Sequence, residues 1–162
     1  MKWFAVALGL LVIALFVVDF GSDEVKGFHV DVSLKILDAR TGQPLVGYGV
    51  LTLPDQKLAT DHTWIAESWA VFEQSPNGNA LAARGAAAGK TVADGSANLV
   101  LFVHSRRDEL RKRDGCPFIA VIRLDPGPDL LAVVETSGRW NLDAQTGRYR
   151  FAMDPIRIAV PR

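Results

Sequence analysis

The chain has 162 residues, 49% of them hydrophobic, which is enough for one hydrophobic core or two small ones. Its 18 basic and 18 acidic residues balance, so the net charge indicates neither a nucleic-acid partner nor an acidic substrate. The single cysteine, Cys116, excludes an intrachain disulfide and a cysteine-based metal cluster. These limits leave a small domain whose function must be sought in local patterns.

The N-terminal residues predict where the protein resides. Residues 3–18 carry no charge and would form about 24 Å of helix, slightly less than the thickness of a bilayer's hydrocarbon core. No pair of small residues suited to signal peptidase follows, which favours an uncleaved anchor, although a removed signal stays open. Lys2 precedes the apolar run and Asp19 follows it, so the positive-inside rule places the bulk of the chain outside the cytoplasm.

These features predict three parts. Residues 1–20 form a membrane anchor or signal, with residues 3–20 in contact with the membrane, and residues 21–27 form a polar linker. Residues 28–162 form an extracytoplasmic domain, periplasmic or extracellular.

The domain opens with a strongly patterned pair of strands. Residues 28–37 alternate apolar and polar side chains, which is typical of a strand with one buried face. Asp38, Gly42 and Pro44 then supply the residue types that a tight turn needs. A second strand is predicted over residues 46–53, so we expect a β-hairpin here.

This opening resembles a known family. The run ILDARTGQPLVGYGVLTL, residues 36–53, is similar to the start of the transthyretin-like β-sandwiches, notably the carboxypeptidase regulatory-like domains. Those domains have a strand, then Asp, a Thr-Gly-x-Pro-Leu turn, a small residue and a second strand. The matching residues here are Asp38, Thr41, Gly42, Pro44, Leu45 and Gly47.

A second stretch is similar to the next signature of the same family. That signature is a threonine followed by an Asp-Gly turn and an alternating strand. The run TVADGSANLVLFV, residues 91–103, places Asp94 and Gly95 at the turn. The resemblance implies an all-β, prealbumin-like Greek-key sandwich.

The rest of the chain is compatible with about seven strands. Five further β-rich runs are expected, at residues 98–103, 118–124, 130–136, 149–153 and 156–160. Two segments are less clear: residues 61–73 fit a helix capped by Asp61 or an alternating strand, and residues 105–114 fit a short solvated helix or loop.

The fold family also contains hydroxyisourate hydrolases, which suggests an enzymatic alternative. In those enzymes a catalytic histidine precedes the Val-Leu-Asp of the turn, and the chain ends in Tyr-Arg-Gly-Ser. Here Lys35 stands at the histidine position and the chain ends RIAVPR. A lysine charged at neutral pH does not simply replace a neutral imidazole as general base, so this activity is the less favoured reading.

The stretch GAAAGKT, residues 85–91, invites a nucleotide-binding interpretation. A phosphate-binding loop needs four residues between its first glycine and the Gly-Lys pair, and it needs a helix after them. Here three residues intervene, and the Asp-Gly turn follows. We therefore expect no nucleotide; the motif should lead into a hairpin, and any local helix should span residues 80–88.

No motif predicts a cofactor or a metal. His29, His62 and His104 are far apart in sequence, and no HExxH, CxxC or Gly-x-Ser-x-Gly pattern occurs. We expect the histidines to be ordinary surface or satisfied side chains.

Two groups of residues are candidate contacts for a ligand or partner. Arg106, Arg107 and Arg111 belong to a basic cluster, although neighbouring acidic residues favour a solvated face. Trp64 and Trp69, together with Trp140, could form an aromatic platform, although such rings more often fill a core.

These observations predict a membrane-anchored, extracytoplasmic β-sandwich module, non-catalytic and without a cofactor. Its function would be protein interaction or envelope structure, with another envelope protein or a glycan as partner and no nucleic acid. A carbohydrate- or peptide-binding accessory domain is the alternative.

Overall fold

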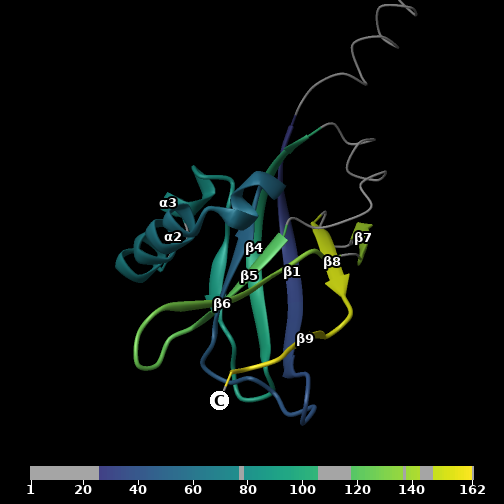
Figure 1. Cartoon of the computed structure of the whole chain (residues 1–162). Helices are drawn as coiled ribbons and strands as arrows, with labels where there is room; N and C mark the ends of the chain where they lie inside the picture. Colours follow the sequence, from purple (N-terminus) through teal and green to yellow (C-terminus); the bar gives the residue numbers. More distant parts are fainter. Residues whose placement is uncertain (1–25, 77–78, 106–117, 137, 143–147, 162) are drawn as a thin grey trace, which may run out of the picture.

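The computed structural model describes residues 26–76, 79–105, 118–136, 138–142 and 148–161. Within them the chain forms two β-sheets and a small layer of helices (Figure 1). This confirms the prediction of a mostly β fold with two sheets. The predicted anchor at residues 1–20 lies outside the described part of the chain. Inside it, no helix is both long and apolar enough to cross a bilayer.

The first sheet is built on one long strand, β1 (Lys26–Asp38). It pairs antiparallel with β4 (Ser96–Ser105) and parallel with both β8 (Tyr149–Met153) and β9 (Ile156–Ile158). β7 (Gly138–Leu142) extends the sheet through antiparallel pairing with β8. The alternation of apolar and polar residues in the sequence therefore predicted β1 correctly. The strand begins at Lys26, so it includes the last two residues of the predicted linker.

The second sheet is antiparallel and has four strands. Its order is β3 (Ala88–Lys90), β2 (Gly49–Leu53), β5 (Phe118–Arg123) and β6 (Asp129–Val134). The pairing of β5 with β6 shifts register, which leaves Leu131 as an extra residue in β6. β6 is therefore an edge strand with a bulge near its middle.

The main core lies between the two sheets. The inward row of β1 that the sequence predicted is buried there, and β8 adds Tyr149 and Phe151. The second sheet supplies Val50 from β2 and Val121 from β5. The buried residues of β1 are Val30, Val32, Leu34 and Ile36.

The outer face of the second sheet is covered by helices. These are η1 (Gln56–Thr60), α2 (His62–Gln74) and α3 (Asn79–Ala82), which lie on the side of this sheet away from β1 (Figure 1). Segment 61–73 is therefore a helix, and Asp61 caps it by accepting a 2.9 Å hydrogen bond from the Trp64 amide. α3 is much shorter than the helix expected over residues 80–88.

The turn after β1 forms as predicted, but the hairpin does not. The Asp38 carboxylate accepts a 2.7 Å hydrogen bond from the Arg40 amide, and Leu37 makes an isolated antiparallel bridge with Pro44. Beyond this bridge the chain leaves the first sheet, and β2 pairs only with strands of the second sheet. The prediction of a β-hairpin between residues 28–37 and 46–53 is therefore wrong.

The reason lies in the residues that follow the turn. Pro44 has no N–H with which to continue a ladder. Gly47 has a φ of 77°, and its amide donates a hydrogen bond to the carbonyl of Thr91, the residue directly after β3 of the second sheet. Thr91 also accepts a 2.9 Å hydrogen bond from the Tyr48 amide through its hydroxyl. These contacts direct the chain onto β3 instead of back along β1.

The Asp94-Gly95 turn also forms, and it too crosses between sheets. Asp94 accepts hydrogen bonds from the amide and the hydroxyl of Ser96, at 3.0 and 2.6 Å. The Gly95 carbonyl accepts a 2.9 Å bond from the Ile36 amide, which places this turn beside the first one. The chain therefore passes from β3 in the second sheet to β4 in the first, and the hairpin expected after GAAAGKT is wrong.

All seven predicted strands are present, with ends that differ by a few residues. Two short strands were not predicted, β3 and β7. β3 contains Gly89 and Lys90 of the GAAAGKT stretch, so these two residues pair with β2 in a sheet.

Three glycine-to-alanine variants should separate backbone strain from steric overlap. Gly95→Ala should lower the free energy of unfolding most, by about 3 kcal/mol or more, because its φ is 78° and a Cβ would lie 2.6 Å from the Ile36 carbonyl oxygen. Gly42→Ala should cost roughly 1–2 kcal/mol, since its φ is 70° but nothing lies near its Cβ position. Urea unfolding followed by tryptophan fluorescence measures the free energy of unfolding of both variants.

Gly127→Ala is the matched control. Nothing lies within 4 Å of its Cβ position and its φ is not positive, so a change within about 0.5 kcal/mol is expected. If Gly42→Ala and Gly95→Ala lowered the free energy of unfolding equally, this result would contradict the packing of the two turns against each other.

Candidate functional site

A pocket of about 240 Å³ opens where the end of β6 meets the turn between β8 and β9. The segment after β6 and the β8–β9 turn lie on different sheets, so the pocket is at the open edge of the sandwich. Its apolar lining continues the main core. The lining residues are Val134, Glu135, Thr136, Met153, Asp154, Pro155, Ile156 and Arg157.

The pocket follows from the way β8 and β9 pair with β1. Val30 pairs with Tyr149 and Ile36 pairs with Ile156, so six steps along β1 correspond to seven along the partner. The extra residue must leave the ladder, and it does so in the Asp154–Pro155 segment between the two strands. This displaced segment forms one wall of the pocket.

The charged residues of the pocket lie on its exposed rim. Glu135, Asp154 and Arg157 are all exposed, and none of them has an ion-pair partner among the residues that the structure describes. Among the described residues of the lining, two carboxylates and one guanidinium leave one formal negative charge. The rim therefore favours a cation over an anion.

The inner part of the pocket is apolar. Ile156 is buried, and Val134 and Met153 are half-buried against the main core. The volume lies below the ~300–1,000 Å³ of pockets that hold drug-sized ligands. The pocket therefore fits a group the size of one side chain, with an apolar body and a charged end.

Trp69 does not take part in the aromatic platform that the sequence offered as an alternative to core packing. Trp69 is 1% exposed, and its ring packs so closely on Gly49 that a Cβ there would lie 2.6 Å from it. Trp64, five residues earlier on α2, is half-buried. Trp140 belongs to β7, and its side chain lies outside the described part. Trp69 is therefore a core residue, and its assignment to an exposed contact is wrong.

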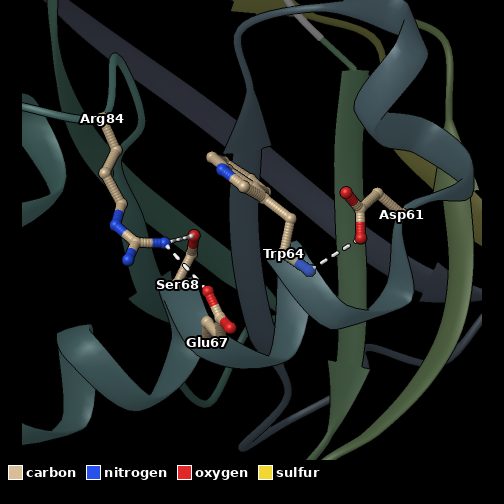
Figure 2. A network of polar contacts seen from close by, with 5 residues as sticks. All are labelled: Asp61, Trp64, Glu67, Ser68 and Arg84. Atoms are coloured by element: carbon tan, nitrogen blue, oxygen red, sulfur yellow. Dashed lines mark hydrogen bonds and ion pairs between the residues drawn. The ribbon is translucent and has the colours of Figure 1, made fainter.

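The surroundings of Trp64 hold a small polar network, shown in Figure 2. Arg84, just after α3, donates a 3.2 Å hydrogen bond to the Ser68 hydroxyl and lies 3.8 Å from the Glu67 carboxylate (Figure 2). Because Ser68 is buried on α2, these contacts tie the end of α3 to α2. This network lies on the helical side of the second sheet, away from the pocket, and its role is structural.

The lysines that the sequence singled out have structural contacts. Lys90, the lysine of GAAAGKT, lies 4.0 Å from the Glu73 carboxylate and 6.0 Å from the centroid of the Trp69 ring. Lys35 pairs with Ser96 across β1 and β4 and lies near Asp94.

The structure describes only some of the other candidate residues. Arg106, Arg107 and Arg111 lie outside it, as does Cys116. His29 contacts Phe102, with ring centroids 5.1 Å apart, and His62 begins α2. Within the described ranges, no three His, Cys, Asp or Glu residues are placed to hold a metal ion.

Comparison of the chain with protein-family models, with curated proteins and with solved structures finds no match. The likeness to transthyretin-like domains therefore stays a prediction, based on the two turn signatures. The site must be interpreted from its own geometry.

The pocket was not predicted from the sequence. Its charged residues, Glu135, Asp154 and Arg157, come from two segments that resemble ordinary ends of strands. One signal was present: Pro155 divides two β-rich runs that are otherwise nearly continuous. Such a break can indicate a residue displaced from a ladder.

The turn at Asp94 generates a prediction on pH. The hydrogen bond from the Ser96 hydroxyl, followed by the one from the Ser96 amide, holds the pKa of Asp94 below its ordinary value, and Lys35 adds to this effect. Ser96→Ala should therefore raise the pKa of Asp94 toward its ordinary value. Titration of the Asp94 carboxyl carbon by NMR measures this change.

The sign of the stability effect follows from that direction. Because the folded-state pKa is depressed, the ionised carboxylate stabilises the turn above the unfolded-state pKa, and this contribution is lost as pH falls through the folded value. Ser96→Ala should reduce the acid dependence of unfolding, whereas Ser33→Ala, elsewhere on the first sheet, should not. An unchanged Asp94 titration in Ser96→Ala would contradict the assignment.

Proposed function

We propose that this chain is a non-catalytic β-sandwich module that binds another protein on the extracytoplasmic side of a membrane. The observation that supports this most directly is the position of the pocket, which lies at the end of an edge strand. Edge strands and side-chain pockets are the two elements by which sheets recognise extended segments of other proteins.

The sequence of β6 supports this function. Its residues DLLAVV are mostly apolar, and the last five are half-buried. In the described part of the chain, β6 pairs with β5 on one side and with no strand on the other. An apolar edge strand of this kind can template pairing with another chain, so proteins usually either block it or use it.

The proposed fold family and location depend on the sequence. The transthyretin-like, Greek-key assignment is supported by the two signature turns, which come into contact through Ile36 and Gly95. The anchor and the extracytoplasmic location are supported by the uncharged run at residues 3–18 and by the charges that flank it. The absence of a catalytic role is proposed from Lys35, which stands where the related hydrolases have histidine.

A protein partner fits the site better than a glycan does. Glycan platforms use exposed aromatic rings, and Trp69 is buried under β2. None of the described residues that line the pocket is aromatic, and the size of the pocket fits one side chain.

Photo-crosslinking from the pocket rim tests the proposal. Glu135 is replaced by a photoreactive amino acid in the full chain, which is expressed in its native membrane and irradiated. We expect a covalent adduct of defined mass with one protein, identified by mass spectrometry, because position 135 lies at the mouth of the pocket.

Glu73 provides the control position. It is a partly exposed glutamate on α2, on the helical side of the second sheet. The same replacement there should not give the adduct. No adduct from position 135, or identical adducts from both positions, would reject protein binding at the pocket.

A further inference from the structure

We infer that the pocket binds a lysine or arginine side chain of an extended partner segment, which adds to β6 as a new edge strand. This inference rests on the proposed function and specifies the chemistry of the partner. Three observations support it: the charge of the rim, the apolar lining, and the position of β6 beside the pocket.

The charge of the rim selects a cation. The rim carries the negative charges of Glu135 and Asp154 and the positive charge of Arg157. None of the three forms an ion pair with another described residue. A lysine or arginine head group would give both carboxylates a partner and would also compensate the charge of the rim. An acidic side chain could pair only with Arg157 and would face two like charges.

The apolar lining selects a long side chain. Val134, Met153 and Ile156 make the inner part of the pocket apolar, so an aliphatic stem can pack there, while the charges lie on the exposed rim. Lysine and arginine bury their methylene stems along apolar surfaces and keep the charged end near water. The volume of about 240 Å³ suits one such side chain.

The edge of β6 positions the partner. Val134 ends β6 and also lines the pocket, so strand and pocket are continuous. A strand added beside β6 would lie about 4.8 Å away, and alternate side chains would point toward the first sheet. One of these would enter the pocket between Val134 and the β8–β9 turn.

The bulge at Leu131 restricts where pairing can occur. Regular pairing geometry is interrupted at this residue, so only the end of β6 nearest the pocket offers a regular edge. The interaction therefore combines a short ladder with one anchoring side chain. Neither the short ladder nor the anchoring side chain alone gives much affinity. The affinity therefore depends on which residue of the partner enters the pocket.

The test uses the full chain in detergent micelles and fluorescein-labelled nine-residue peptides. The peptides contain alternating threonine and valine and differ only at the central residue, which is lysine, arginine, norleucine or glutamate. Fluorescence anisotropy should show the lysine and arginine peptides binding about tenfold more tightly than norleucine, with glutamate weakest. Equal binding, or a preference for glutamate, overturns the inference.

Removing negative charge from the rim and removing positive charge from it should change the affinity for the lysine peptide in opposite directions. Glu135→Gln combined with Asp154→Asn should reduce lysine-peptide affinity about tenfold, whereas Arg157→Gln should raise it about threefold. Glu73→Gln, on α2, is the matched control and should change nothing. Thermal melts followed by circular dichroism establish that each variant is folded. A lysine preference that survives in the double variant overturns the inference.

Backbone methylation of the peptide tests strand addition separately. Two versions of the lysine peptide carry N-methyl groups on alternate residues, one on the odd and one on the even positions. Only one edge of an added strand faces β6, so one version should bind like the parent and the other should lose more than about tenfold in affinity. Equal affinities of the two versions overturn the inference.

The two proposals fail in different ways. If position 135 crosslinks to a protein but the peptides bind without regard to the central residue, protein binding stands and the lysine or arginine pocket is rejected. If the lysine preference holds but position 135 gives no adduct in the native membrane, the pocket chemistry stands and its use for partner binding there is rejected.

Discussion

The pairing of β1 on both of its edges is the constraint on which the first sheet and the pocket depend. One edge of this 13-residue strand takes β4, and the other takes β8 and then β9 in parallel. The buried row from Val30 to Ile36 fixes the register of all these partners, because a slip of one residue would turn it toward water. With the register fixed, the extra residue between β8 and β9 must leave the ladder. The pocket is therefore a consequence of core packing.

The second sheet satisfies a different constraint, since it is covered on both faces. All five residues of β2 and the four central residues of β5 are buried, between the first sheet on one side and α2 on the other. Strands of this kind need continuous apolar runs, with polar groups satisfied locally. Thr52, a buried polar residue of β2, is satisfied in this way, because its hydroxyl accepts a 2.7 Å hydrogen bond from the Ala87 amide. The helices add a third layer to the two sheets of the sandwich.

Local patterns in the sequence predicted local structure well and long-range pairing poorly. The alternation of β1, the Asp38 turn and the Asp94-Gly95 turn are encoded by neighbouring residues, and all three are confirmed. The hairpin predictions were wrong because the partner of β2 depends on the hydrogen bond between Gly47 and Thr91, 44 positions away. Thr91 directly follows β3, a strand of three residues that was too short to predict. The pocket could not be predicted because its charged residues come from two different sheets, and the segment that carries Asp154 is displaced only by the register of β8 and β9 on β1. Segment 61–73 stayed ambiguous because Ile65, Trp69 and Phe72 fit a helical period. Trp64, Ala66, Ala70 and Phe72 fit the alternation of a strand equally well.

The strand edge proposed here for partner binding would also carry a risk of aggregation, and the structure contains features that limit this risk. A long, flat, apolar edge would pair with any exposed strand. In β6 the bulge at Leu131 interrupts the edge, and Asp129 at its start is held by Arg123 at 2.6 Å. Only the part beside the pocket keeps a regular edge, and there Glu135 and Asp154 add a charge requirement. In the proposed interaction, a segment without a cation would gain only a short ladder, so the rim would discriminate between a partner and an unrelated strand.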